Sequence, residues 1–177
     1  MIVLDRDGVI NVDKGYHADW TKWEWCSGAP ESLFALQMAG YQTAIVTNQS
    51  GINRGFFGDD DYFELMAQAR SDLFQRLGNK YCYWPTVTVY CPHIPDEQCE
   101  CRKPKTKLWF DHVEPAFRPI DLARSWFVDD KVENLAFGKE LGLNTVLIGA
   151  QGVDRCGYWV CGSLHHFAER LLRRSVR

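Results

Sequence analysis

Five short segments of apolar or β-branched residues recur along the chain, separated by stretches with helical periodicity. They are 2–4, 41–46, 86–90, 126–128 and 145–148. Runs of this kind are typical of strands buried on both faces of a parallel sheet. Asp5 follows the first, Thr47 the second, and Asp129-Asp130 the fourth. We expect these polar groups to meet at one edge of a sheet, because parallel strands end on the same side.

Helical periodicity fills the intervals between the strand segments. We predict helices over 31–39, 59–77, 133–141 and 164–173. Near the start of the second helix, Asp61 and Glu64 resemble a capping box. Strands that alternate with helices predict an α/β protein with a Rossmann-like, doubly wound parallel sheet. The 177 residues fit one domain over 1–177.

Composition narrows the range of partners. No run approaches the roughly 18 apolar residues of a membrane span, and the first residues show no signal-peptide pattern. We therefore expect a cytoplasmic protein without a membrane partner, and a monomer. The net charge of −3 disfavours nucleic acid as a partner. A small phosphorylated metabolite remains compatible, because it needs only a few local cations.

Asp5 and Asp7 stand two residues apart, directly after the first strand segment and before Gly8. Two carboxylates at this spacing suit a division of labour. One attacks and binds a metal, while the other donates and recovers a proton. Neighbouring carboxylates shift each other's pKa, so one can remain an acid while its partner is ionised. For an isolated D-x-D, a solvated turn rich in aspartate is the more common interpretation.

Groups that suit phosphate follow at later points of the chain. Thr47 offers a hydroxyl, and the loop after it offers backbone donors. Arg102-Lys103 supplies two adjacent cations, and Asp129-Asp130 supplies carboxylates for a hard cation such as Mg²⁺. Together with the two N-terminal carboxylates, these groups indicate magnesium-dependent chemistry on a phosphoryl group.

In this order, the four pieces resemble the motifs of the haloacid dehalogenase (HAD) superfamily of phosphohydrolases, from Met1 to about Gly149. The resemblance implies a Mg²⁺-dependent phosphomonoester hydrolase that forms an aspartyl-phosphate. The implied roles are nucleophile and magnesium ligand for Asp5, general acid/base and magnesium ligand for Asp7, phosphoryl binding for Thr47 and Lys103, and magnesium ligand for Asp130. Many members carry a second aspartate four residues further on, where this chain has Asn134. The roles of Asn134 and Asp129 are therefore open.

A compact set of thiols and one imidazole lies in 91–101. The spacing C-x-H-x5-C-x-C supplies four donors, Cys91, His93, Cys99 and Cys101. Three thiolates and an imidazole complete a tetrahedral shell for Zn²⁺ with no position left for substrate, which indicates a structural site. Such a site can hold the loop that leads into Arg102-Lys103. Chance clustering is the alternative. The scattered cysteines Cys26, Cys82, Cys156 and Cys161 are interpreted as core or surface thiols.

The segment CPHIPDEQCECRKPK resembles a capless, zinc-containing subfamily of HAD phosphatases. Its members act on D-glycero-D-manno-heptose 1,7-bisphosphate or on histidinol phosphate. No insertion is long enough for a large cap domain, so loops are expected to bind the substrate. Loops 11–16 and 47–55 resemble those of the heptose enzymes, whereas 103–108 is similar to the histidinol-phosphate relatives. The residues assigned to substrate binding are Asp13, Lys14, Gly15, Tyr16, Thr47, Asn48, Gln49, Ser50, Arg54, Arg102, Lys103 and Lys131.

Removal of the 7-phosphate from the heptose bisphosphate is the favoured activity, and histidinol phosphate or another small metabolite is the alternative. A receiver-like domain or a zinc interaction module would have no use for the acid/base Asp7. A polynucleotide 3′-phosphatase is disfavoured by the net acidity. The cluster of Trp20, Trp23 and Trp25 is interpreted as a packed edge or an interface. The basic cluster of Arg170, Arg173, Arg174 and Arg177 is interpreted as a solvated face.

Overall fold

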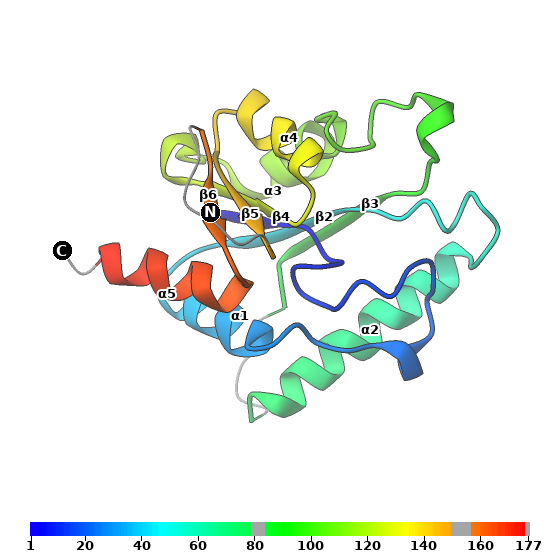
Figure 1. Ribbon diagram of the computed structural model, residues 1–177, viewed down its shortest axis with the longest axis horizontal. Coiled ribbons are helices and arrows are strands. Elements are labelled where there is room, and N and C mark those ends of the chain that lie inside the picture. Colours follow the sequence, from blue (N-terminus) through cyan, green and yellow to red (C-terminus); the bar gives the residue numbers. More distant parts are fainter. Residues whose placement is uncertain (79–83, 150–156, 176–177) are drawn as a thin grey trace.

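Six parallel strands form one sheet in the part of the chain that the computed structural model describes, residues 1–78, 84–149 and 157–175 (Figure 1). From edge to edge the order is β3-β2-β1-β4-β5-β6. The strand bounds are β1 Ile2–Leu4, β2 Thr43–Asn48, β3 Val87–Cys91, β4 Trp126–Asp129, β5 Asn144–Ile148 and β6 Trp159–Cys161. The order reverses between β1 and β4, which is where ligands bind in doubly wound sheets. The predicted fold class is confirmed.

Two strand boundaries differ from the prediction and bear on the site. Thr47 lies within β2, where it pairs with Tyr90, instead of just past the strand end. Asp129 is the last residue of β4 and pairs with Leu147. The strand β6 was not predicted, because its three residues are too few to show a period.

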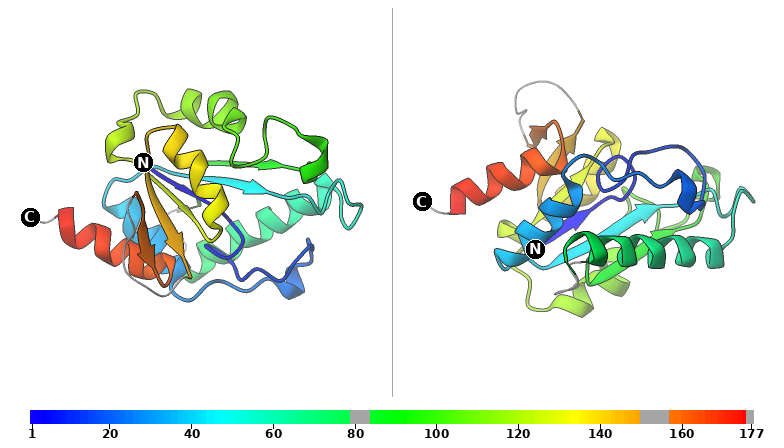
Figure 2. Two further views of the ribbon diagram at one scale, coloured as in Figure 1. Left: turned by 45° about the horizontal axis from the view of Figure 1, so that its top comes forward. Right: turned by 90° about the horizontal axis from the view of Figure 1, so that it is seen from below.

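Helices cover both faces of the sheet. The helix bounds are α1 Ala29–Met38, α2 Asp59–Arg76, α3 Glu114–Phe117, α4 Leu135–Glu140 and α5 Leu164–Ser175, with a π-helix η3 at Trp109–Val113 and 3₁₀ turns η1 Trp20–Lys22, η2 Pro95–Glu97, η4 Leu122–Arg124 and η5 Val132–Asn134. Helices α1, α2 and α5 lie on one face, and α3 and α4 lie on the other (Figures 1 and 2). The predicted helix over 133–141 is divided into η5 and α4.

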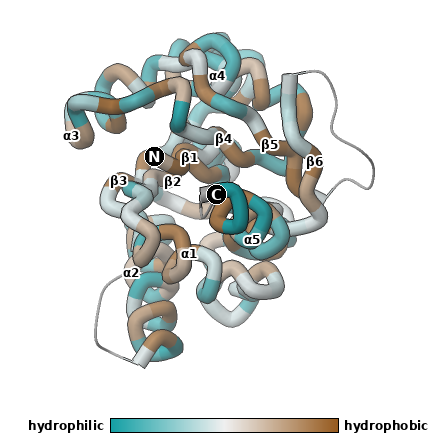
Figure 3. The backbone as a smooth tube through the Cα atoms, turned by 90° about the vertical axis from the view of Figure 1, so that its left-hand side faces the viewer, coloured by the Kyte–Doolittle hydropathy of each residue, from teal (hydrophilic) through white to brown (hydrophobic). Residues whose placement is uncertain are grey.

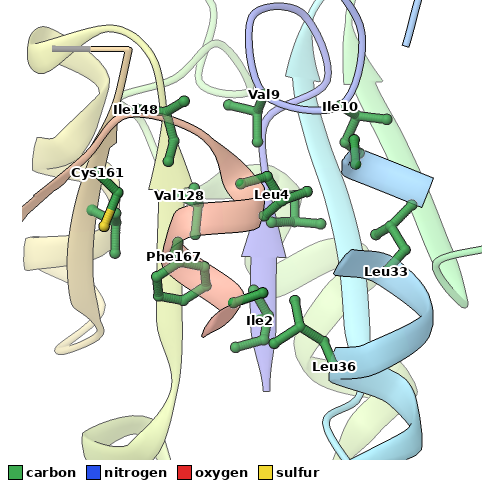
Figure 4. Close-up of a cluster of buried hydrophobic side chains, with 14 of the residues drawn as sticks. Ile2, Leu4, Val9, Ile10, Leu33, Leu36, Val128, Ile148, Cys161 and Phe167 are labelled. Atoms are coloured by element: carbon green, nitrogen blue, oxygen red, sulfur yellow. The ribbon is translucent and has the colours of Figure 1, made fainter. Parts of the chain in front are cut away.

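Alternate residues of β1 point to opposite faces and join two separate cores. Ile2 and Leu4 are fully buried in a cluster with Leu33 of α1 and Phe167 of α5 (Figure 4). Val3 is fully buried in the other cluster, which contains residues of η3 and α4. In Figure 3 strands β1, β4 and β5 are largely brown, whereas the helices mix brown and teal. Burial of β1 on both faces fixes the position from which Asp5 emerges.

Helix ends and helix packing follow local chemistry. The carboxylate of Asp61 accepts a hydrogen bond from the backbone N–H of Gly58 at 2.7 Å. The cap of α2 therefore pairs Asp61 with Gly58, and the predicted pairing with Glu64 is wrong. A Cβ at Gly138 would lie 2.6 Å from a methyl carbon of Thr145, so glycine lets α4 pack closely on the sheet.

The tryptophan cluster packs against the body of the protein, which agrees with its interpretation as a packed edge. Trp20 stacks on Trp23 with ring centroids 5.9 Å apart. The indole N–H of Trp25 donates to Asp72 of α2 at 2.7 Å.

In the described residues, neither 5–28 nor 49–58 contains a cap domain, and no helix combines the length and hydropathy of a membrane span. Cys82, Cys156 and Arg177 lie outside the described residues.

Candidate active site

Side chains from four segments meet at the carboxyl edge of the sheet. Asp5 follows β1, Thr47 lies near the end of β2, and Asp129 ends β4. Lys103 belongs to the segment that leaves β3. The chain leaves β1, β2 and β3 on the same side of the molecule in Figure 1. The convergence expected from the strand pattern is therefore present.

Lys103 is the centre of a buried ion network. Its Nζ donates to Asp129 Oδ2 at 2.6 Å and lies 3.0 Å from Asp5 Oδ1. Burial disfavours the ammonium, but Asp5 and Asp129 outweigh this effect and raise the pKa of Lys103. The lysine therefore remains charged beside the predicted nucleophile.

Three carboxylates lie close together at this edge, where a hard divalent cation could bind. One oxygen from each of Asp5, Asp129 and Asp130 lies within 4.8 Å of the other two. Burial raises the pKa of Asp5 to about 7 and the pKa of Asp130 to about 6, and the charge of Asp129 adds to both shifts. Asp130 Oδ1 is buried and has no hydrogen-bond partner among the described residues. A cation at this point would satisfy that oxygen, so the residues fit Mg²⁺.

Gly8 lets the chain pass directly over Asp130. Its φ is +77°, and a Cβ there would lie 2.3 Å from Asp130 Oδ2. Any side chain at this position would be strained and would displace the carboxylate. The glycine of the D-x-D-G motif is therefore required by the approach of the first loop to the acidic strand end.

Asp7 is held by donors on three sides. The guanidinium of Arg6 donates to both of its oxygens, with Nη2 2.8 Å from each. The amide of Asn11 donates at 2.9 Å, and the amide of Gln49 donates at 2.8 Å. Burial acts to raise the pKa of Asp7, but Arg6 and these hydrogen bonds outweigh it and lower the pKa. In the substrate-free protein Asp7 is thus the ionised carboxylate, and the raised pKa belongs to Asp5.

The sequence motifs assign no role to Arg6. Only 2% of the residue is exposed, and its guanidinium lies 5.5 Å from the ring centroid of Tyr62 and donates to Gln49 at 3.1 Å. A charge directly after a buried strand requires buried partners. An arginine directly after an apolar strand is therefore the sequence signal that could have identified Arg6.

The residues after Thr47 hold other groups of the site. Gln49 donates to the Thr47 hydroxyl at 2.9 Å as well as to Asp7. The side chain of Asn48 accepts from the backbone N–H of Lys103 at 3.0 Å and donates to its carbonyl at 3.2 Å. Ser50 is buried. Asn48 and Gln49, both predicted to bind substrate, therefore use their amides to position Lys103 and Asp7.

The four predicted zinc donors form one cluster. Sulfur–sulfur distances among Cys91, Cys99 and Cys101 are 3.2–3.5 Å, and His93 Nδ1 lies 3.1 Å from Cys101 Sγ. These sulfur distances exceed a disulfide bond of about 2.05 Å. They approach the spacing of about 3.8 Å for a tetrahedral Zn²⁺ with Zn–S bonds of about 2.3 Å. The donor set fits a closed metal site.

Most of the remaining predicted substrate residues form an exposed rim. We define the rim as Asp13, Lys14, Gly15, Tyr16, Arg54, Phe56 and Lys131. Tyr16 stacks on Phe56 with centroids 5.3 Å apart, and the guanidinium of Arg54 lies 5.3 Å from the Tyr16 centroid. Lys131 Nζ lies 3.7 Å from an Asp13 carboxylate oxygen. Arg102 instead donates to the backbone carbonyl of His93 at 3.1 Å. This hydrogen bond ties Arg102 to loop 91–101, which carries the four metal donors and is called the metal loop.

The chain is similar in sequence to known proteins over most of its length. The family model described as polynucleotide kinase 3 phosphatase matches residues 2–142. The D-glycero-beta-D-manno-heptose-1,7-bisphosphate 7-phosphatase of Helicobacter pylori is 36% identical over 137 residues, which span 77% of this chain and 76% of the relative. The protein of the same name from Vibrio cholerae is 36% identical over 158 residues, which span 85% and 81% of the two chains.

The fold is similar to solved structures as well. D,D-heptose 1,7-bisphosphate phosphatase from B. bronchiseptica, complexed with magnesium and phosphate, superposes with a TM-score of 0.84 at 30% identity over 98% of each chain. The enzyme of that name from Burkholderia thailandensis gives a TM-score of 0.66 at 28% identity over 97% of each chain.

Proposed function

Because this chain belongs to the polynucleotide kinase 3 phosphatase family, we propose that it hydrolyses a phosphomonoester through an aspartyl-phosphate at Asp5. Its relatives and the solved structures make it a HAD-like phosphatase. The observation that carries the proposed mechanism is the Lys103 ammonium, which lies between the carboxylates of Asp5 and Asp129. A fixed cation beside the nucleophile stabilises the negative charge of a phosphoryl group under attack.

The reaction proceeds in two displacements. In the first, a carboxylate oxygen of Asp5 attacks phosphorus, the bond to the leaving oxygen breaks, and Asp7 donates a proton to that oxygen. In the second, Asp7 takes a proton from water, the water oxygen attacks phosphorus, and phosphate leaves Asp5. Asp7 must be protonated when substrate binds, although its pKa is lowered in the substrate-free protein. A phosphate dianion nearby acts in the required direction, because a like charge favours the protonated carboxyl.

Two metals accompany this mechanism. Asp5, Asp130 and the backbone carbonyl of Asp7 would hold Mg²⁺, which supplies positive charge to the phosphoryl oxygens when bound. Cys91, His93, Cys99 and Cys101 would hold a structural Zn²⁺. The zinc loop positions the catalytic cations, since Arg102 is hydrogen-bonded to His93 and Lys103 follows directly.

D-glycero-D-manno-heptose 1,7-bisphosphate is the proposed substrate, with the 7-phosphate removed. The names of the relatives support this choice. The rim also supports it, because Lys14, Arg54 and Lys131 offer cations for a second phosphate outside the buried network. The enzyme is proposed to act as a cytoplasmic monomer.

Hydrolysis of a 3′-phosphorylated polynucleotide is the second candidate, favoured by the description of the matching family. The net charge of −3 opposes it, because binding to a polyanion draws on clustered cations. Both candidate reactions would use the same buried catalytic residues. The two substrates would differ only in the part that contacts the rim.

Steady-state phosphate release with Mg²⁺ distinguishes these substrates. The two heptose 1,7-bisphosphate anomers, histidinol phosphate and a 3′-phosphorylated oligonucleotide would be compared side by side. The proposal predicts that kcat/KM for one heptose anomer exceeds that for every other compound by at least about 100-fold, the effect of two charge-assisted contacts. A higher kcat/KM for the oligonucleotide or for histidinol phosphate would overturn the substrate assignment.

A further inference from the structure

Asp129 stands next to a proposed magnesium ligand, yet its contacts indicate another role. We propose that Asp129, held by Asn134, is a positioning residue that fixes the ammonium of Lys103 and does not bind the metal. This inference rests on the proposed function and adds to it the role of two residues. It also accounts for asparagine at position 134, where related enzymes often carry aspartate.

The carboxylate of Asp129 is fully buried and its acceptor sites are occupied. Oδ2 accepts from Lys103 Nζ at 2.6 Å, and Oδ1 accepts from the backbone N–H of Lys131 at 2.9 Å. The amide of Asn134 donates to Oδ1 at 3.0 Å and to Oδ2 at 3.1 Å. An ionised carboxylate offers about four lone-pair sites, and these contacts use four. A metal bound by Asp129 would have to displace one of the donors.

Asp130 presents the opposite situation. Its Oδ1 is buried and has no hydrogen-bond partner in the described part of the chain. Of the two adjacent carboxylates, therefore, Asp130 has an oxygen available for a cation and Asp129 does not. Both residues lie close to Asp5, but their contacts suit different tasks. Asp130 is suited to bind the metal, and Asp129 is suited to hold Lys103.

Lys103 shows what the positioning achieves. An ammonium has three donors, and two of them are directed at Asp5 and Asp129. The third remains for the phosphoryl group. Loss of the Asp129 charge would leave the ammonium drawn toward Asp5 alone, and it would weaken the support for a charged lysine that is almost fully buried.

Asn134 matches this arrangement because it is a neutral donor. It lies in η5, close enough to donate to both oxygens of Asp129. An aspartate at 134 would place a like charge against Asp129, so the sequence can carry one carboxylate in this pair. Exchange of the two residues moves the carboxylate to position 134 and keeps the total charge and the hydrogen-bonded pair, so the negative charge stays close enough to Lys103 to retain part of its attraction.

The test compares Asp129→Asn with the exchange variant Asp129→Asn/Asn134→Asp. Asp111→Asn, an exposed aspartate of η3 paired with Lys107, is the matched control. Turnover of heptose bisphosphate, the magnesium dependence of turnover and thermal unfolding are measured for each. We expect Asp129→Asn to lower kcat by about 10²–10³-fold at saturating Mg²⁺ and to change the half-saturating Mg²⁺ concentration by less than about threefold. The exchange variant should recover at least about tenfold of the lost kcat.

Two results would overturn the inference. One is a loss of Mg²⁺ affinity of 100-fold or more in Asp129→Asn with kcat restored at saturating Mg²⁺, which would make Asp129 a ligand. The other is an exchange variant that folds like the wild type and is no faster than Asp129→Asn. If Asp129→Asn does not fold, the exchange variant decides alone, with kcat within about 100-fold of wild type expected. Failure of the wild type on every phosphate ester would instead reject the proposed function.

Discussion

The buried network around Lys103 and the exposed rim both carry charge, but they hold it differently. In the network, Asp5, Lys103 and Asp129 are 5%, 2% and 0% exposed, and each contacts at least two partners. In the rim, the side chains of Lys14 and Lys131 are 37% and 49% exposed, and each makes an ion pair with a neighbouring carboxylate. The comparison indicates that the sheet fixes the buried network, whereas the rim lies on exposed loops, which contact the substrate under the proposed function.

The physical difference lies in desolvation. A buried charge that loses its partner has no water to replace it, so breaking one contact destabilises the whole network. An exposed ion pair contributes little, because water solvates either charge when the partner is removed. Substitutions in the network should therefore affect every substrate, whereas substitutions in the rim should affect only substrates that reach it.

The largest effect is expected for Asp5→Asn. The amide cannot act as the nucleophile, so turnover of every phosphate ester should fall by at least about 10⁴-fold. Phosphate release measures the change, with Asp111→Asn as the control for a lost carboxylate that belongs neither to the network nor to the rim. Residual activity above about 1% of wild type in a preparation free of wild-type enzyme would remove Asp5 from that role.

A smaller effect is expected where the metal loop joins the network. Cys99→Ser should release Zn²⁺ and lower kcat/KM by about 10–100-fold for all substrates, because the loop positions Arg102-Lys103. Elemental analysis and kinetics provide the measurement. Cys161→Ser, a buried thiol of β6 outside the cluster, should retain about one Zn²⁺ per chain. Loss of zinc without any change in kcat/KM would separate the loop from catalysis.

The rim should respond selectively. Arg54→Ala should lower kcat/KM for the heptose bisphosphate by about tenfold, the contribution of one charge-assisted hydrogen bond. For a heptose 7-monophosphate it should change little. Arg118→Ala, an exposed arginine paired with Glu114, is the control. Equal losses on both substrates would mean that Arg54 serves the network instead of the rim.

The smallest effect concerns the stability of the metal-free protein. The pKa of Asp5 is raised to about 7 and that of Asp130 to about 6. Both groups bind protons in the folded state that they release in the unfolded chain above about pH 4, so stability should fall as pH rises from about 4 to 7. Thermal unfolding with a chelator measures the slope, which Asp5→Asn should flatten. The raised pKa values would be contradicted if the wild type became more stable as pH rises over this window and Asp5→Asn did not.

The sequence predicted the meeting of polar groups at one edge of the sheet because its signal is local. Asp5 and Asp130 follow apolar strands, and the parallel sheet then requires them to meet. The contact of Gln49 with Asp7 was not predictable in this way, since it forms only after β1 and β2 pair. The same holds for Asn134, whose amide reaches Asp129 through the path of η5. Strand ends can be read along the chain, but side-chain hydrogen bonds between elements depend on packing.

The most direct test of the account is a trapped phosphoenzyme. Wild-type protein would be mixed with Mg²⁺ and substrate, quenched in acid within one turnover, digested and analysed by mass spectrometry. We expect one phosphoryl group on the peptide that contains Asp5, located on Asp5 itself and removed by hydroxylamine, as for an acyl phosphate. Asp5→Asn should yield none. A phosphoryl group on any other residue, or full turnover by Asp5→Asn, would contradict Asp5 as the nucleophile.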